Sequence, residues 1–213
     1  KVVEIADEFR NDLPKTDGTN QQYQELKAEA MEKLMPINTD FDGAKDLFGH
    51  AKDEFDQVDD KECKELSQEC EERGEETGDQ KEALRKKLED MLDKLIGEDQ
   101  EERAYNYVVD FFNNTYEENQ DELQTKLGDA LKKIEESTSP EERAEIVKDL
   151  DRIVDKLVDK MDKVGAAAGD ALENDLYDPD KVAKVEDIKR QCDEYGDKMR
   201  KYVADAIDDA LQN

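Results

Sequence analysis

The sequence predicts an all-α protein, an elongated bundle of about six or seven helices that ends in an antiparallel hairpin of two long helices. Two observations carry this prediction. Apolar residues recur at spacings of three and four along most of the 213-residue chain, which is the period of a helix face. No run of alternating apolar and polar residues bounded by turn residues occurs, so no strand is predicted.

The composition alone is also typical of a disordered chain. The sequence carries 61 Asp and Glu residues against 32 Lys and Arg, for a net charge of −29, and 35% of its residues are hydrophobic. Low hydrophobicity with high net charge is the signature of disorder. The orderly spacing of the apolar residues, with capping residues where helices start, favours a folded helical protein instead.

Three short helices are predicted in the N-terminal part, over residues 2–13, 23–34 and 44–58. Each places apolar residues on one helical face. Pro and Gly residues mark the breaks between them, at residues 13–18 and 35–38. Thr39 or Asp40 is expected to cap the third helix.

Two helices are predicted in the middle of the chain. The first opens at a capping pair, Asp79 and Glu82, and ends at Gly97. Asp99 with Glu102 is expected to cap the second, whose apolar positions continue to Ile134. This second helix contains the most aromatic stretch of the sequence, from Tyr105 to Tyr116.

The two C-terminal helices give the strongest signal. Ser139 precedes Pro140 and two Glu residues, a capping arrangement that predicts a helix over residues 140–172. Asp178 and Pro179 open a second helix of similar length, so the short connection predicts a hairpin in which small residues 165–169 allow close packing. Apolar residues alternate at spacings of three and four on both: Val147, Leu150, Val154, Leu157, Met161, Val164, Ala168 and Ala171, then Val185, Ile188, Cys192, Tyr195, Met199, Tyr202 and Ala206.

An acidic segment suggests how the chain divides. Residues 53–79 hold 13 acidic residues against three basic ones and are expected to form an exposed helix or helix end. We therefore expect an N-terminal short-helix region over residues 1–78 that ends in this acidic helix, and a long-helix bundle over residues 79–213. One continuous domain is the alternative, because a chain of this length can bury a single core.

The three cysteines leave two alternatives open. Cys63 and Cys70 are seven residues apart on one predicted helix, hence about 10.5 Å apart, whereas a disulfide needs Cα atoms within about 7 Å. Either Cys192 is bridged to one of them, or all three are reduced and act as small apolar side chains. Zinc is not expected, because no CxxC pair or second His supplies further ligands.

Two hints favour a secreted or secretory-vesicle protein over a cytoplasmic one. The chain begins at Lys1 rather than Met, which fits either a removed signal peptide or a trimmed sequence. Asn113, followed by Asn114 and Thr115, matches the N-glycosylation pattern and is a glycosylation candidate.

The sequence offers little material for catalysis, so no enzyme activity and no cofactor are expected. GxSxG, GxxxxGK[ST] and GxGxxG are absent, and His50 is the only imidazole. No apolar run is long enough to span a membrane. A surface with this much negative charge repels the phosphate backbone of nucleic acids, so no nucleic-acid partner is expected.

A segment at residues 38–43 resembles part of an EF-hand calcium loop. Asn38, Asp40 and Asp42 match its first three ligand positions, but Gly49 stands where the bidentate Glu is required. No metal site is therefore expected. Divalent cations are expected to screen the acidic surface non-specifically.

Function is expected to lie in the apolar helix faces and the acidic surface. The first hypothesis is a structural or interaction protein that self-associates or docks a protein partner through helix seams, with or without cations. An extracellular carrier of lipid or another small hydrophobic ligand is the alternative, and an acidic surface for a basic partner is a third hypothesis. The candidates for apolar contacts are aromatic, with core packing as the competing interpretation: Tyr105, Phe111, Phe112 and Tyr116, then Tyr195 and Tyr202.

Overall fold

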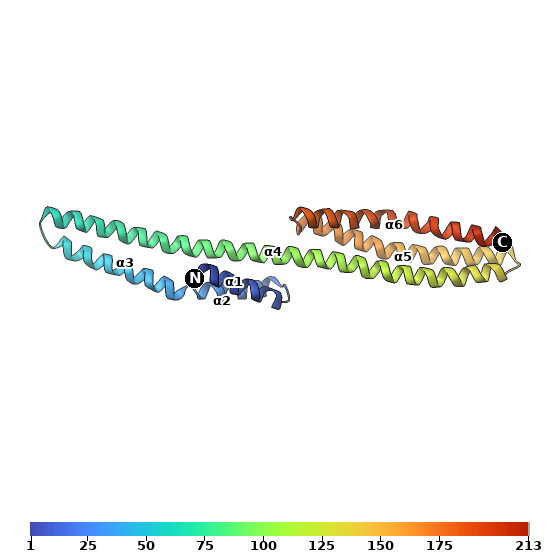
Figure 1. Cartoon of the computed structure of the whole chain (residues 1–213), viewed down its shortest axis with the longest axis horizontal. Coiled ribbons are helices and arrows are strands. Elements are labelled where there is room, and N and C mark those ends of the chain that lie inside the picture. Colours follow the sequence, from blue (N-terminus) through green and yellow to red (C-terminus); the bar gives the residue numbers. More distant parts are fainter. Residues whose placement is uncertain (213) are drawn as a thin grey trace. The chain divides into compact units, whose positions relative to one another are not determined.

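The computed structural model describes residues 1–212, and these residues form helices and connections with no strand. Six α-helices and one 3-10 helix are present in this part of the chain (Figure 1). The all-α prediction is confirmed. The helices are α1 (Val2–Asp12), η1 (Leu13–Lys15), α2 (Asn20–Glu32), α3 (Met35–Asp56), α4 (Lys61–Glu136), α5 (Pro140–Asn174) and α6 (Pro179–Gln212).

The chain groups into two compact units. Unit 1 comprises Lys1–Gln100 and unit 2 comprises Glu101–Asn213, so α4 contributes residues to both. The boundary predicted after residue 78 lies inside unit 1. Whether residues 1–78 and 79–213 form separate domains stays a prediction.

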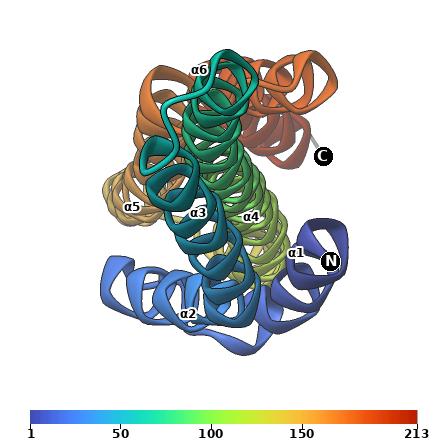
Figure 2. The same cartoon turned by 90° about the vertical axis from the view of Figure 1, so that its left-hand side faces the viewer.

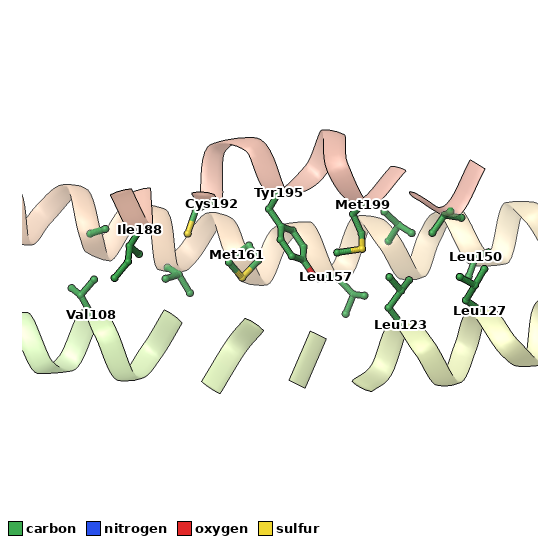
Figure 3. Close-up of a cluster of buried hydrophobic side chains, with 14 of the residues drawn as sticks. Val108, Leu123, Leu127, Leu150, Leu157, Met161, Ile188, Cys192, Tyr195 and Met199 are labelled. Atoms are coloured by element: carbon green, nitrogen blue, oxygen red, sulfur yellow. The ribbon is translucent and has the colours of Figure 1, made fainter. Parts of the chain in front are cut away.

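Unit 2 is built from the C-terminal part of α4 with α5 and α6, and buried apolar side chains of all three helices form its core (Figure 3). Most of the predicted seam positions of α5 and α6 are buried, from Leu150 to Ala171 and from Val185 to Met199. Buried positions on α4 complete the core: Val108, Leu123, Leu127, Ala130 and Ile134.

The predicted seam of α6 is wrong near its end. Tyr202 is 55% exposed, whereas Val203 and Ile207, which the sequence also places on the apolar face of this helix, are buried. A straight helix has 3.6 residues per turn, so a strict repeat of 3.5 rotates by about 20° per heptad away from its partner. After Met199 the buried positions therefore follow at a spacing of four residues, at Val203 and Ile207.

The predicted starts of both C-terminal helices are confirmed. The Ser139 hydroxyl accepts a hydrogen bond from the backbone N–H of Glu142 at 3.3 Å, and Pro140 occupies the first turn of α5. The Asp178 carboxylate accepts hydrogen bonds from the N–H groups of Asp180 and Lys181, at 2.9 and 3.2 Å. Each acceptor satisfies donors that have no partner inside the helix.

The small residues of α5 lie where α5 and α6 approach closely. A Cβ atom added to Gly165 would lie 3.2 Å from the Cβ of Cys192, whereas one added to Gly128 on α4 would meet nothing within 4 Å. The predicted close packing at residues 165–169 is therefore present.

These two glycines give opposite expectations for one substitution. Gly128→Ala is expected to stabilise the protein by about 1 kcal/mol, because alanine restricts the unfolded chain and favours helix without any clash. In the Gly165→Ala variant the same gain is offset by crowding against Cys192. The free energy of unfolding of this variant is therefore expected to be lower than that of the Gly128→Ala variant. Urea denaturation of the two variants checks the order, and equal gains would contradict the close packing of α5 on α6.

Unit 1 has its own core, in which α1 and α2 pack against α4. The aromatic ring of Tyr23 is completely buried there, and its hydroxyl donates to the Asp99 carboxylate at 2.7 Å. Lys27 of α2 is ion-paired with Asp93 at 2.6 Å and Glu89 at 3.5 Å. The buried side chains are Val2, Ile5, Ala6, Phe9, Leu13, Tyr23, Ala30, Leu34, Leu88, Leu92, Leu95 and Ile96.

The helix break predicted at Gly97–Asp99 is wrong, as is the helix start predicted at Asp79. One helix, α4, begins at Lys61 and continues through both positions to Glu136. Leu95 and Ile96 are held in the core of unit 1 just before Gly97, and Asp99 accepts from Tyr23. A glycine inside a helix costs only about 1 kcal/mol, which tertiary packing of this kind exceeds.

Helix α3 runs antiparallel to the first part of α4, and both views show the two helices side by side (Figure 1 and Figure 2). Asp56 accepts from Ser67, the Gly74 position faces Phe48, and Lys81 is paired with Asp42 at 2.6 Å, so residue numbers fall along α4 as they rise along α3. The cap predicted at Thr39 or Asp40 is wrong, because α3 already begins at Met35 with Pro36 in its first turn.

Candidate functional site

A cavity of about 270 Å³ that is partly open to solvent lies in unit 2, between α4, α5 and α6. Four aromatic residues, two methionines, two Gln and one Lys line it, and polar atoms contribute slightly more of its surface than apolar atoms do. The lining residues are Phe112, Tyr116 and Gln120 of α4, Met161 of α5, and Gln191, Tyr195, Lys198, Met199 and Tyr202 of α6.

The cavity occurs at the level of the bundle where α4 presents short polar side chains to the interior. Between the buried Val108 and Leu123, the buried α4 residues are Thr115 and Asn119. Both are smaller than the leucines that fill the next turns of α4. Neither Thr115 nor Asn119 lines the cavity, whose α4 side chains are Phe112, Tyr116 and Gln120.

The aromatic rings beside the cavity contact one another. Phe112 and Tyr116 stack with ring centroids 5.7 Å apart, and Tyr116 meets Tyr195 edge to face at 6.2 Å. Both distances lie in the favourable range for aromatic pairs. Tyr195 is 4% exposed and points from α6 into the interior of the bundle (Figure 3).

Asn119 and Tyr195 bring polar atoms to this apolar region. The side-chain N–H of Asn119 donates to the Leu157 carbonyl at 2.9 Å, which fixes the amide against α5. The Asn119 Oδ1 and the Tyr195 hydroxyl are buried without an aligned hydrogen-bond partner. Burial raises the pKa of Tyr195, and the nearby Asn119 amide opposes this in part. The hydroxyl is therefore protonated at neutral pH and able to donate.

The aromatic contact candidates from the sequence divide into two groups. Phe112 and Tyr116 line the cavity together with Tyr195 and Tyr202. Tyr105 and Phe111 are half-buried against the core of unit 2 instead. Sequence reasoning did not single out Asn119 as part of a site, although a polar residue four positions before the buried Leu123 is a recognisable exception in the helix pattern.

The calcium-loop candidates lie on a helix. Asn38, Asp40 and Asp42 belong to α3, and Asp42 is paired with Lys81. Helical residues two positions apart do not face each other, so this backbone does not converge the three side chains on one point. Within residues 1–212, no group of three or more His, Cys, Asp or Glu side chains is placed to hold a metal ion.

Asn113, the glycosylation candidate, is exposed on α4, whereas Thr115 of the same motif is buried. Glycosylation of Asn113 stays a prediction. None of the helices in the described part of the chain is apolar over a length that could cross a membrane.

The three cysteines are free thiols in the structure, with Cys63 and Cys70 partly exposed on α4 and Cys192 buried on α6. Burial, with smaller contributions from Asp193 and Asp162, raises the pKa of the Cys192 thiol to about 11. At pH 8 the thiolate fraction of Cys192 thus falls about 100-fold below that of a thiol with the ordinary value.

Two thiols are therefore expected to react rapidly with an aromatic disulfide reagent at pH 8 in the native protein, and the third only after unfolding in urea. A Cys192→Ala variant is the control, because it should give two reactive thiols in both conditions. If only one thiol reacts and the others need a reductant, Cys192 is bridged to Cys63 or Cys70, the alternative left open by the sequence.

Unit 1 carries a second candidate site, the surface of the α3–α4 pair. No residue of α3 is fully buried, and several large apolar side chains on the pair are exposed. They are Met35, Leu47 and Leu66, with Val58 in the connection between the two helices; Leu47 is the most exposed, at 71%. The acidic residues of segment 53–79 lie on the same pair.

The fold and these two sites define an all-α helical-bundle protein with an aromatic cavity in one unit and an incompletely covered helix pair in the other. Comparison of the chain with protein-family models, with curated proteins and with solved structures found no match.

Proposed function

We propose that the protein is a non-enzymatic interaction protein, and that its α3–α4 pair docks an amphipathic helix of a protein partner. The observation that carries the proposal is that α3 pairs with α4 over its length while burying none of its side chains fully. Two-helix pairs leave the flanks of their seam open, and a third helix covers such flanks in most bundles.

Charge favours a basic partner over a second copy of this chain. Segment 53–79, with 13 acidic and three basic residues, covers the end of α3 and the start of α4. Two such surfaces repel each other, whereas Lys and Arg on the polar face of a partner helix are attracted to them. The apolar face of that helix would then cover Leu47 and Leu66.

A fluorescently labelled peptide of roughly 20 leucine and lysine residues, with the leucines on one helical face, tests this docking mode. We expect saturable binding to the full chain, measured by fluorescence anisotropy. Binding should weaken steeply as salt rises from about 50 to 200 mM, because charge attraction contributes to the affinity.

Leu47→Glu is expected to weaken peptide binding about tenfold, since it places a charge in the apolar contact. Leu211→Glu on α6 makes the same change at an exposed leucine outside unit 1 and should leave the affinity unchanged. A scrambled peptide of the same composition that binds equally well would contradict helix docking. Sedimentation that shows a dimer, with or without Ca²⁺ and reductant, would favour self-association instead.

The cavity of unit 2 favours a second candidate function, the binding of a small hydrophobic ligand. Aromatic and methionine side chains with a few polar groups are typical of ligand pockets. Native mass spectrometry of the protein from its own source tests this candidate. A bound hydrophobic molecule is expected, and a protein that is empty and whose thermal melt is insensitive to lipid would contradict it.

A secreted or vesicular location remains part of the proposal. Its test is the intact mass of the native protein before and after reduction and deglycosylation. A glycan on Asn113 would place the chain in the secretory pathway, whereas an unmodified mass with three reduced thiols would favour the cytoplasm.

A further inference from the structure

We propose that two copies of this chain associate through α4 in antiparallel orientation, by pairing an acidic and a basic stretch on one exposed side of this helix in unit 1. The inference goes beyond the proposed function, because it concerns a different side of α4 from the one that packs against α3. The partner is a second copy of the chain.

Two shallow hollows mark this side of α4, and both are lined by α4 residues. The acidic stretch lines the first hollow and consists of Glu65, Gln68, Glu69, Glu72, Arg73 and Glu76. The basic stretch lines the second and consists of Ala83, Lys86, Lys87, Asp90, Met91 and Lys94. All of these residues except the partly buried Met91 are exposed.

The two stretches lie on one line along the helix. Each residue of the basic stretch follows its counterpart in the acidic stretch by 18 positions, as Lys87 follows Glu69. Such a separation equals five turns of about 3.6 residues and a distance of about 27 Å. The line faces away from α3, because the Gly74 position faces Phe48 of α3 and Glu76, two positions further, is rotated by about 200°.

Antiparallel pairing of two copies brings the acidic stretch of each chain against the basic stretch of the other. We place the two-fold axis midway between Glu76 and Lys87, which gives three pairs of opposite charge, each present twice by symmetry. The pairs are Glu69 with Lys94, Arg73 with Asp90, and Glu76 with Lys87. Like-charged surfaces of the two copies are therefore not brought together along this line.

The basic stretch is open to a partner in charge and in surface. Within residues 1–212, neither Lys86 nor Lys87 is ion-paired. The lysine stems, together with Ala83 and Met91, also make the surface of this hollow mostly apolar. An opposing helix would thus cover apolar area as well as form ion pairs.

The net charge of −29 on each chain opposes the association, so salt decides which effect is larger. At an ionic strength of about 0.15 M, charges separated by more than about 8 Å are largely screened, whereas ion pairs in contact are screened less. At about 1 M salt the screening length falls to about 3 Å, and the pairs weaken as well. We therefore expect a weak dimer at about 0.15 M salt and a monomer at about 1 M.

Sedimentation equilibrium of the full chain tests the proposal. At about 0.15 M salt, the average mass is expected to rise with protein concentration from that of one chain toward that of two. At about 1 M salt it should stay that of one chain at the same concentrations.

Charge reversal tests the pairing. Glu76→Lys and Lys87→Glu each place like charges opposite each other twice, and each should raise the dissociation constant of the dimer about tenfold. The double variant restores the pair and should have a dissociation constant within about threefold of the original. Lys148→Glu, at an exposed position of α5, makes the same change in net charge as Lys87→Glu and should have no effect.

Glu76→Lys also separates specific pairing from a simple effect of net charge. This substitution makes the chain less negative, so it would strengthen an association that depended on net repulsion alone. A Glu76→Lys variant that associates as well as the original chain, or a double variant that is not restored, would overturn the pairing. A chain that stays monomeric at about 0.15 M salt would overturn the proposal as a whole.

Leu47→Glu distinguishes this dimer from one formed through the α3–α4 pair. The α4 dimer should persist in this variant, and its loss would assign self-association to the α3–α4 pair and contradict the inference. Circular dichroism shows whether each variant is folded, and if a single variant is not, the double variant and the salt dependence still decide. Peptide docking is measured separately at low protein concentration, where the chain is monomeric, so a failure here leaves that proposal standing.

Discussion

Leu157→Ala is expected to lower the free energy of unfolding by about 2–5 kcal/mol. Leu157 is completely buried in unit 2, on α5, where its side chain lies among residues of α4 and α6 (Figure 3). Truncation removes buried methyl and methylene groups and leaves a space that the surrounding helices fill only in part. The Leu157 carbonyl accepts a hydrogen bond from Asn119, and this bond holds the backbone of α5 in place. Because the backbone is held, it cannot move to fill the space, and a large effect is expected.

Urea denaturation followed by circular dichroism measures this change. Leu211→Ala is the matched control in the same unit, since Leu211 is 48% exposed and should lose less than about 1 kcal/mol. A loss at Leu157 no larger than the loss at Leu211 would mean that α5 does not pack against α4 and α6 as described.

Gln100→Pro is expected to destabilise the protein by about 3 kcal/mol or more. Gln100 is exposed and lies inside α4, which continues from Lys61 to Glu136. Proline removes a backbone hydrogen-bond donor from the helix interior, and its ring collides with the preceding turn.

The same substitution distinguishes a continuous helix from the break that the sequence predicts. If a new helix began after Asp99, residue 100 would be its first residue, where proline is favoured, and Gln100→Pro would be neutral or stabilising. Urea denaturation and the loss of helical circular dichroism measure the result. Gln100→Ala is the control and should be close to neutral, because it keeps the hydrogen bond and the helix propensity.

The hairpin of α5 and α6 could be predicted from the sequence because local and tertiary signals agree there. Ser139 and Asp178 provide caps, prolines follow them in the first turn, and the apolar seams begin within the next turns. Each signal depends on neighbours within a few residues, so no knowledge of the partner helix is needed.

The continuity of α4 could not be predicted for the opposite reason. Gly97 and Asp99 are locally typical of a helix end and a new cap. Contacts from residues far away in the sequence decide otherwise, because α1 and α2 bury Leu95 and Ile96, and Tyr23 binds the Asp99 carboxylate. Those contacts form only when the whole unit folds, so the apolar pattern of a single helix does not predict them.

The cavity was accessible to sequence reasoning only in part. Aromatic residues on α4 and α6 were recognisable as contact candidates, and Phe112, Tyr116, Tyr195 and Tyr202 do share one cavity. Whether a ring fills a core or borders a space depends on the residue that faces it. Here Tyr116 and Tyr202 are exposed whereas Tyr195 is buried, and the pattern of a single helix does not predict that difference.

The open surface of α3 also has a consequence for local opening of the backbone. A helix that buries no side chain fully gains little free energy from packing, so its amide hydrogens should exchange with solvent through local opening rather than through unfolding of the whole chain. The amides of α5 from Leu157 to Ala168, where the core-facing side chains are completely buried, are expected to exchange slowly. A partner seated on α3 would slow exchange there first, so the least protected helix of unit 1 is also its most sensitive reporter of binding.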